Sequence, residues 1–488
     1  MWPFAPLRAV EEGIGSFEDI AVSTTASVAR TLVAMLALAV FAAAAQAADG
    51  DPDPTFDEDG RAWHIWPASF AQAETTAVAA LRDGSIVTAG WVDHGDDNRD
   101  FAIAKFRADG SLDTAFGEQG TRVVAFDLEP GGNDRAFGVF ELTDGKLQVV
   151  GAAGIGAPPY DFPASLRLHA NGQLDAGYGT GGKTWLASQP FGTGANFLFS
   201  SAARAADGRI VLAGLCTSCG QGGLPDVLAL RLTAAGQADP SFGNQGWYSF
   251  GRIAPDDTWM IERVSAVAID RDGRVLLAGH EETHTDPDER QRPLLLRLTA
   301  QGQADAAFAE DGLLVLDMLG SWSAAAIATD PGNDSAVLAL NVTNMPAVVP
   351  STFLIRVRST GVLDTVFGDG GLVGMQWAEG NAVHALAIGA DRRINAAGWV
   401  DPDGAAQFYF FAARVLHDGT PDASFDGNGV LQLAMPIDTN THARVSALAL
   451  SGGRQVLAGS LYDVVGTRFA SGVARLQADR IFAAGFEP

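Results

Sequence analysis

Apolar and polar residues alternate with period two in four short segments between residues 61 and 106. The segments are residues 61–66, 76–81, 85–91 and 101–106. Such alternation predicts β-strands that turn one face toward a core. Asp83-Gly84 joins the second segment to the third, and Asp109-Gly110 follows the fourth. Because Asp-Gly favours tight hairpin turns, the pattern predicts four short antiparallel strands.

The same order of strands recurs along the rest of the chain. The third strand returns at residues 146–151, 209–214, 274–279, 335–340, 393–398 and 454–459. The fourth returns at residues 164–167, 228–232, 294–298, 353–357, 411–415 and 472–476. No helix-length amphipathic pattern appears after residue 47. The sequence therefore predicts an all-β protein.

A short motif occurs seven times along the chain, once before each four-strand unit. An Asp is followed three residues later by an aromatic residue, and a Gly follows four residues after that. The first copy is Asp53, Phe56 and Gly60. The other copies begin with Asp113 and Phe116, Asp175 and Tyr178, Asp239 and Phe242, Asp305 and Phe308, Asp364 and Phe367, and Asp422 and Phe425. A long, regular period of 58 to 66 residues indicates a repeat architecture.

The chemistry of the motif indicates a structural role. An Asp carboxylate can accept hydrogen bonds from backbone amides two residues on, and Gly supplies positive φ angles. We expect the aromatic residue to lie between neighbouring units. A catalytic residue is seldom needed seven times, so we assign these residues to the scaffold.

Four antiparallel strands repeated seven times predict a seven-bladed β-propeller over residues 48–478. Radial closure removes the exposed edges that an open stack would leave. An open β-solenoid is the alternative, but it needs capping repeats that the sequence does not show. We expect the first strand after each motif to lie nearest the axis. We also expect each blade to come from one continuous repeat, with Phe56 filling the junction between blades seven and one.

The motif resembles the signature of the delta-60 repeat family, a turn of the type Leu-Asp-x-x-Phe-Gly-x-x-Gly. Residues 112–120 and 363–371 match it well, whereas Tyr178 replaces the Phe, and Ala238, Ala304 and Pro421 replace the first Leu. The resemblance covers essentially all of residues 53–478. It implies an exported or surface β-propeller-like protein without an assigned chemistry.

Composition and charge narrow the range of partners. The 488 residues carry a formal net charge of −26, and charged residues make up 18% of the chain. An acidic surface argues against nucleic acid or an anionic membrane as partner. The charge is compatible with cation binding, but it also serves solubility.

An export signal is predicted near the N-terminus. Arg30 precedes an apolar run over residues 31–45, which ends in Ala45-Gln46-Ala47. A positive flank, a short apolar core and a small-x-small site are typical of a secretory signal peptide, here residues 1–47 with a long n-region. A membrane anchor is the alternative, but the run is short for a span. We expect an exported mature chain without a membrane span and with a C-terminal tail at residues 479–488. The tail resembles a short Ile-Phe-x-x-Gly-Phe-Glu end of exported proteins.

The two cysteines, Cys216 and Cys219, lie three residues apart. In an exported β-protein this spacing favours a local disulfide. Free thiols and a redox or metal pair are the alternatives. A zinc site needs four ligands, so one pair cannot complete it.

The loops that vary in length hold the candidate binding residues. The loops after the first and third strands of each repeat share one face, and variable loops on a rigid scaffold commonly carry function. We expect aromatic platforms beside carboxylates to bind a sugar or a peptide there. The candidate residues are Trp66, Trp185, Trp259, Trp322, Trp377, Asp256 and Asp257. The alternative is that these tryptophans pack inside the blades.

Two further sequence patterns are candidates for metal binding. Asp93, Asp96, Asp97 and Asp100 form a loop rich in oxygen ligands, and calcium accepts flexible oxygen cages. The spacing is not that of an EF-hand, so a solvated loop is the alternative. Residues 280–284 match the H-E-x-x-H pattern, but that zinc chemistry needs a helix and the context is a strand end.

The function predicted from the sequence is a secreted, non-enzymatic scaffold that binds a glycan, peptide or protein partner on the variable-loop face. One alternative is a propeller enzyme, a glycan hydrolase or lyase, that uses carboxylates near the axis. Another is a purely structural envelope component. We expect a monomer that needs no cofactor apart from calcium, if calcium binds.

Overall fold

The computed structural model describes residues 49–478. The exceptions are residues 96–97, 130, 156–159, 188, 192–194, 218, 220–224, 253–259, 284–289, 319, 345–351, 376–379, 403–406, 439 and 464–466. The predicted signal peptide and C-terminal tail lie outside the described residues. No helix long and apolar enough to cross a membrane occurs among the described residues.

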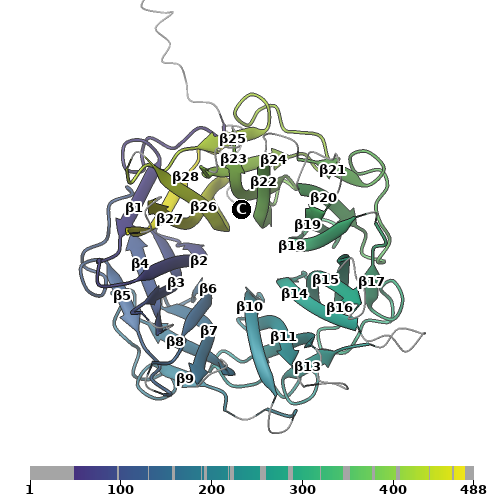
Figure 1. Ribbon diagram of the computed structural model, residues 1–488, viewed down its shortest axis with the longest axis horizontal. Helices are drawn as coiled ribbons and strands as arrows, with labels where there is room; N and C mark the ends of the chain where they lie inside the picture. Colours follow the sequence, from purple (N-terminus) through teal and green to yellow (C-terminus); the bar gives the residue numbers. More distant parts are fainter. Residues whose placement is uncertain are drawn as a thin grey trace, which may run out of the picture. The chain divides into compact units, whose positions relative to one another are not determined.

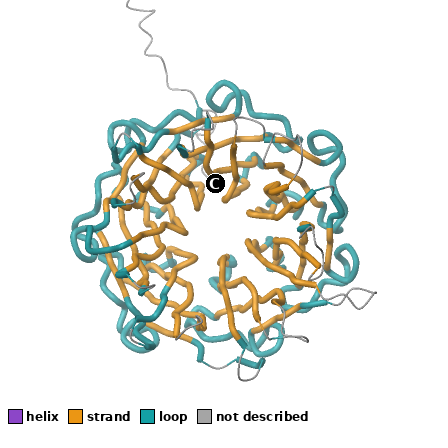
Figure 2. The backbone as a smooth tube through the Cα atoms, in the orientation of Figure 1, coloured by secondary structure: helices purple, strands orange, loops and turns teal. Residues whose placement is uncertain are grey.

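Seven four-stranded antiparallel sheets surround a central axis, which confirms the predicted seven-bladed β-propeller (Figure 1). Figure 2 shows the strands arranged around the axis, with turns and loops at the outer rim. We letter the strands of each blade a to d from the axis outward.

In blades 1 to 6 the strands follow one another along the chain. Blade 1 contains β2 (Gln72–Ala80), β3 (Ile86–Asp93), β4 (Arg99–Phe106) and β5 (Thr121–Val124). Blade 2 contains β6 (Arg135–Glu141), β7 (Leu147–Ile155), β8 (Tyr160–Leu168) and β9 (Lys183–Trp185). Blade 3 contains β10 (Asn196–Arg204), β11 (Ile210–Thr217), β12 (Pro225–Leu232) and β13 (Trp247–Phe250). Blade 4 contains β14 (Met260–Ile269), β15 (Val275–Thr283), β16 (Arg292–Leu298) and β17 (Leu313–Val315). Blade 5 contains β18 (Ser321–Thr329), β19 (Ala336–Asn344), β20 (Thr352–Val357) and β21 (Leu372–Gly374). Blade 6 contains β22 (Gly380–Ile388), β23 (Ile394–Asp401), β24 (Tyr409–Val415) and β25 (Val430–Leu433).

Blade 7 combines both ends of the chain. It contains β26 (Thr441–Ser451), β27 (Arg454–Asp463), β28 (Phe469–Arg475) and, as its outermost strand, β1 (Arg61–Ile65). β1 pairs antiparallel with β28, from Arg61 opposite Ala474 to Ile65 opposite Ala470. The prediction that each blade comes from one continuous repeat is therefore wrong, because an N-terminal strand closes the ring.

The outermost position of β1 also corrects the predicted order of the strands within each blade. The strand after each motif is strand d, the outermost, and not the strand nearest the axis. In blade 1, for example, β5 follows the motif and pairs with β4, which precedes it, with Ala104 opposite Thr121. The motif is therefore a tight connection between two paired neighbours. The longer loop after β5 carries the chain from the rim of one blade to the innermost strand of the next.

Each motif also forms a clamp onto the next blade. In blade 3 the Arg231 guanidinium donates to the Asp239 carboxylate across 2.8 Å and lies 4.6 Å from the Phe242 ring. Arg231 also donates to the carbonyl oxygen of Ala300 in blade 4. The other Asp239 oxygen accepts the backbone N–H of Ser241 at 3.0 Å, as expected for a turn-forming Asp.

The clamp recurs around the ring with different residues. A basic residue on strand c lies over the aromatic ring of its own motif in Arg167 and Tyr178, Arg297 and Phe308, Arg356 and Phe367, Arg414 and Phe425, and Arg475 and Phe56. Lys105 takes this place over Phe116. All seven aromatic side chains are at most 2% exposed. The motif residues Asp113, Asp175, Asp305, Asp364 and Asp422 each form an ion pair with a Lys or Arg. The motif is thus a repeated interblade joint.

The N-terminal segment completes the joints at blade 7. Asp53 pairs with Arg475 at 2.8 Å, and Phe56 is fully buried among residues of blades 7 and 1. The prediction for the position of Phe56 therefore agrees with the structure. Asp49 pairs with Arg414 of blade 6. In the other blades the equivalent basic residue donates instead to a backbone carbonyl oxygen in the turn of the next blade, as Arg356 does to His417.

A glycine near the end of strand b allows the innermost strand to bulge. At Gly90 an added Cβ would lie 1.9 Å from the Glu74 carbonyl oxygen. The pairing register of β2 and β3 shifts at this point, between Thr75 and Ala77. The same close approach, 1.8 to 2.0 Å, occurs at Gly151, Gly214, Gly279, Gly398 and Gly459. The recurring glycine therefore shapes the wall of the central channel.

Candidate functional site

The two faces of the propeller carry different kinds of connection. The a–b hairpin turns and the c–d motifs lie on one face, and the b–c and d–a loops lie on the other. These are the same two groups of loops that the sequence separated. Because the d–a loops start at the rim, they cross the face rather than cluster at the axis. We call the face with the b–c and d–a loops the loop face.

The predicted tryptophan platform does not form among the described residues. Trp66 is 6% exposed, and its indole N–H donates to the Ser471 hydroxyl at 3.1 Å. Trp322 is 3% exposed and packs against Phe353 at 5.0 Å. Trp185 is 39% exposed, but it lies on β9 at the rim. The other candidates, Trp259, Trp377, Asp256 and Asp257, lie outside the described residues.

The predicted calcium loop has basic partners at its two described acids. One Asp93 oxygen accepts the Gly95 backbone N–H at 2.7 Å, and the other lies 3.4 Å from Arg99. Asp100 lies 2.9 Å from His94. Asp96 and Asp97 are outside the described residues. No group of three or more potential metal ligands occurs among the described residues, and calcium binding here stays a prediction.

The H-E-x-x-H pattern begins on a strand and not on a helix. His280 lies on β15 and is 8% exposed. Burial, with the nearby charge of Arg263, lowers its pKa to about 4. His284 is outside the described residues. The helical spacing that a zinc peptidase needs is not provided by this strand.

The innermost strands line the central channel. Its cavity measures about 260 Å³ and is bounded by one segment of each strand a. The bulge residues on this wall are Thr76, Phe137, Ser200, Ser265, Ala325, His384 and Ser446. Small and hydroxyl-bearing residues predominate, and no Asp or Glu lines this cavity among the described residues. The axial carboxylates expected for an enzyme are thus not found in this part of the channel.

A second cavity opens on the loop face where blade 7 meets blade 1. It measures about 310 Å³, and we call it the junction pocket. Its lining residues are Gln72, Ala73, Glu74, Trp91, Arg444, Ser446, Ser460, Tyr462 and Phe469. Strands β2 and β3 of blade 1 and β26, β27 and β28 of blade 7 supply them. The pocket therefore combines aromatic walls with one acid and one base.

The two charged groups of the junction pocket are both exposed to it. The pKa of Glu74 is raised, chiefly because surrounding protein displaces water from its carboxyl group. The charges of Arg99, Arg135 and Arg444, with a hydrogen bond from Trp91, oppose this shift. The Arg444 guanidinium lies 4.4 Å from the Phe408 ring centre and 5.5 Å from that of Trp399. Aromatic stacking thus fixes the base that faces the pocket.

A row of aromatic rings continues from the pocket toward blade 6. The rings of Tyr462 and His442 are stacked at 4.9 Å, and His442 lies 5.3 Å from Phe408. Phe408 lies 4.6 Å from Trp399, whose indole N–H donates to His384 at 3.2 Å. Burial and the nearby charge of Arg444 lower the pKa of both histidines. The two histidines of the row are therefore uncharged at neutral pH.

These residues were not selected from the sequence. Glu74 and Arg444 lie 370 positions apart and meet only because the ring closes. Trp91 and Trp399 do have one feature in common that is visible in the sequence: each directly follows the recurring glycine of strand b. An alignment of the repeats at that glycine would have singled them out.

A cluster of buried charges lies in blade 4 below the same face. Glu262 on β14 and Glu281 on β15 are directly opposite each other, and both are at most 1% exposed. Arg252 and Arg292 form ion pairs with Glu281, the latter at 2.7 Å. Neither carboxylate oxygen of Glu262 has a hydrogen-bond partner among the described residues, although the Arg252 guanidinium lies 3.9 Å from one of them. Burial, followed by the charges of Glu281 and Asp226, raises its pKa to about 8.

The Glu281 position is apolar in the other blades. When the recurring glycines are superimposed in the sequence, Val92, Ala153, Cys216, Val400 and Leu461 occupy it. The acid pair is therefore specific to blade 4. Blade 2 contains a single buried acid of a similar kind, Asp134. Its pKa is raised to about 7 by burial and by the charge of Asp100.

We predict that Glu262 makes stability fall as the pH rises. Its folded-state pKa of about 8 exceeds the ordinary value of 4.5 for a glutamate, so folding takes up a proton between these values. The wild-type melting temperature should fall between about pH 5 and about pH 8, by the equivalent of roughly 3–4 kcal/mol, since one pKa unit corresponds to about 1.4 kcal/mol. Glu262→Gln should flatten this profile. Glu282→Gln, which changes a more exposed neighbour, should leave the profile unchanged, and equal slopes in all three proteins would contradict the prediction.

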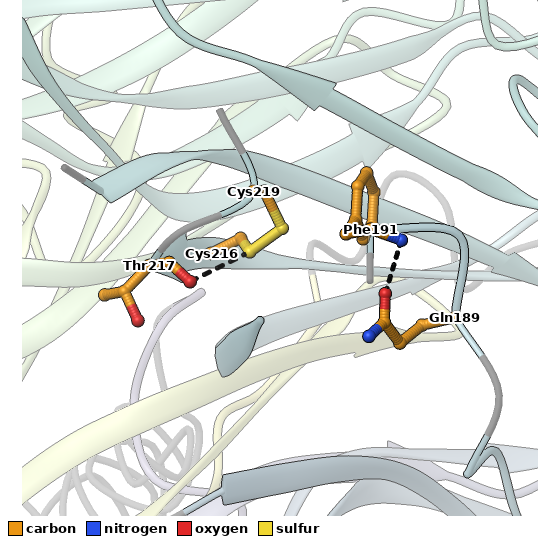
Figure 3. The surroundings of a disulfide bond; sticks show 5 residues. All are labelled: Gln189, Phe191, Cys216, Thr217 and Cys219. Atoms are coloured by element: carbon orange, nitrogen blue, oxygen red, sulfur yellow. Dashed lines mark hydrogen bonds between the residues drawn. A yellow bond between two sulfur atoms is a disulfide. The ribbon is translucent and has the colours of Figure 1, made fainter. Parts of the chain in front are cut away.

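The two cysteines form a disulfide in blade 3 (Figure 3). Cys216 on β11 and Cys219 are joined with their Cα atoms 5.7 Å apart. Cys216 is fully buried, and Phe191 packs against the same cluster. The disulfide therefore ties the loop after β11 to the blade core, which is a structural role.

Comparison with known proteins supports the fold and leaves the chemistry open. Residues 81–116 and 205–242 match a β-propeller family described as a domain of unknown function, DUF5122. The sequence matches no curated protein.

Among solved structures, the polysaccharide lyase Uly1 superimposes with a TM-score of 0.49 at 10% identity, over 83% of this chain and 90% of that one. A protein of unknown function from Dyadobacter fermentans gives 0.42 at 14% identity, over 86% of this chain and 98% of that one. The β-propeller domain of the Trilobed protease from Pyrococcus furiosus gives 0.44 at 8% identity, over 85% and 95%. Such low identities concern the fold alone. Together with the matched segments, the structure makes this chain a seven-bladed β-propeller with similarity to a propeller family of unknown function.

Proposed function

We propose that this chain is an exported delta-60 repeat propeller that binds a glycan in the junction pocket without transforming it. The observation that carries the proposal is the combination of aromatic walls, one carboxyl group and one guanidinium in a cavity of about 310 Å³. This volume is near the lower end of ligand pockets, roughly 300–1,000 Å³. It is therefore suited to the terminal unit of a saccharide.

Sugar chemistry fits the lining of this pocket. Aromatic faces present flat apolar surface to the C–H groups of a sugar ring, and charged groups at the edge bond its hydroxyls. Tyr462 and Phe469 supply apolar surface, while Glu74 and Arg444 supply an acceptor and a donor. A peptide that adds to a sheet needs a free strand edge. Of the strands at the pocket, β3, β27 and β28 are paired on both sides, and the free edges of β2 and β26, the innermost strands of their blades, face the central channel.

A glycan and peptide array with the purified protein tests this proposal. We expect selective glycan binding that Tyr462→Ala weakens by at least about tenfold, because buried aromatic contacts often carry much of a binding free energy. Trp185→Ala, which changes an exposed tryptophan at the rim, is the matched control and should bind as the wild type does. Binding that is confined to peptides, or that is equally weakened by both variants, would refute the proposal.

A glycan hydrolase or lyase is the second candidate function. Its support is the presence of acids with strongly raised pKa values, Glu262 at about 8 and Asp134 at about 7. Groups of this kind occur at catalytic centres. However, neither residue lines the junction pocket or the central channel. Release of new reducing ends or unsaturated products from a polysaccharide panel, abolished by Glu262→Gln, would favour the enzyme.

A further inference from the structure

We propose that the glycan bound in the junction pocket carries a carboxylate, and that Arg444 is the residue that recognises it. The inference rests on the proposed glycan-binding function and specifies its ligand class. An acidic sugar at the end of a chain, such as a uronic acid, has the required chemistry: a ring that contacts aromatic walls and a carboxylate that pairs with a guanidinium.

The first support is that Arg444 has no acidic partner among the described residues, whereas two other arginines close to Glu74 each have one. Arg99 lies 3.4 Å from Asp93, and Arg135 lies 2.7 Å from Asp161. The Arg444 guanidinium forms no ion pair and no hydrogen bond with any described residue, in a chain that has 58 acids and 32 bases. It is nevertheless exposed on the wall of a cavity. A base left unpaired in an acidic protein is therefore available to a ligand.

The second support is the way in which the guanidinium is held. The Arg444 Cζ atom lies over the Phe408 and Trp399 rings, 4.4 Å and 5.5 Å from their centres. The N–H donors lie in the plane of a guanidinium and are not used by stacking. Arginine binds carboxylates through two parallel hydrogen bonds in this plane. The side chain is thus preorganised for a carboxylate without being satisfied by the protein.

The third support is the acid on the opposite side of the same pocket. Glu74 is close enough for the charge of Arg444 to act on its pKa, but the two groups form no ion pair. Its carboxyl group can therefore accept or donate hydrogen bonds to sugar hydroxyls while Arg444 takes the carboxylate. A neutral sugar would leave the guanidinium without a partner on binding, which costs affinity.

Titration calorimetry with trigalacturonate and its methyl ester tests the inference, since the two probes differ only in their carboxylates. We expect the wild-type protein to bind the free acid at least about tenfold more tightly than the ester, as charge-assisted hydrogen bonds require. Arg444→Gln should abolish this preference while the ester still binds. Arg82→Gln, on the a–b turn at the opposite face, should keep the preference. Equal melting temperatures of the three proteins establish that folding is intact.

The outcomes separate this inference from the proposed function. Equal binding of acid and ester by the wild type would overturn the inference but leave glycan binding in place. A preference for the acid that survives in Arg444→Gln would also overturn it, because another base would be responsible. If a neutral glycan from the array binds and trigalacturonate does not, only the inference fails. If no saccharide binds at all, the proposed function fails as well.

Discussion

Deletion of residues 49–65 is expected to prevent the propeller from folding. The segment supplies β1, the outermost strand of blade 7, and with it the Asp53 and Asp49 partners of Arg475 and Arg414. Arg475 would stay buried without its carboxylate, which costs about 3–5 kcal/mol when one partner of a buried pair is lost, whereas Arg414 would lose Asp49 but keep Asp422. Loss of the buried Phe56 adds a cavity worth about 3–5 kcal/mol. Together these losses match the whole stability of a typical domain, about 5–15 kcal/mol.

A point variant tests the same closure in a chain that keeps its full length. Ala62→Asp places a charge on β1 at a position that is 2% exposed, whereas Ile65→Asp changes a position on the same strand that is 40% exposed. We expect Ala62→Asp to accelerate hydrogen exchange across β26, β27 and β28 first, and Ile65→Asp to resemble the wild type. A stable deletion variant with unchanged exchange in blade 7 would contradict this account of ring closure.

Phe367→Ala is expected to lower the free energy of unfolding by about 3–5 kcal/mol, the usual cost of truncating a buried Phe. The side chain is fully buried between blades 5 and 6, and Arg356 stacks on its ring at 4.7 Å. Its neighbour Val366 is 71% exposed, so Val366→Ala is a matched control within one motif. That control should change stability by less than about 0.5 kcal/mol.

Denaturant titration of both variants checks this prediction. Phe242→Ala in blade 3 should cost as much as Phe367→Ala, because the same joint recurs there. Neither change should selectively remove glycan binding at the junction pocket. A Phe367→Ala protein that is as stable as Val366→Ala, or one that is stable but no longer binds its ligand, would show that the motif is not simply a structural joint.

The repeat motif was sufficient to predict the number of blades but not the order of strands within them. Period-two alternation shows that a segment is a strand, yet it carries no information on distance from the axis. Residues 61–66 were therefore placed nearest the axis, whereas β1 is at the rim. The pairing of Ala104 with Thr121 across the motif decides the question, and this is a tertiary fact.

The junction pocket could not be predicted because its residues come from distant parts of the chain. Glu74 and Trp91 belong to blade 1, and Arg444 and Tyr462 belong to blade 7. The tryptophans chosen from the sequence were selected for their loops, but Trp66 and Trp322 pack inside the protein instead. Tryptophan is more often a packing residue than a platform, and only burial distinguishes the two uses. The Glu281 position, by contrast, was detectable as an acid where other repeats have apolar residues.

The most direct test of glycan binding at the closure of the ring is a crystal structure of the protein with the saccharide that the array selects. We expect the sugar ring to contact Tyr462 and Phe469 in the junction pocket, with its carboxylate within hydrogen-bonding distance of Arg444. A saccharide bound in the central channel beside Ser200, or on the face that carries the motifs, would contradict it.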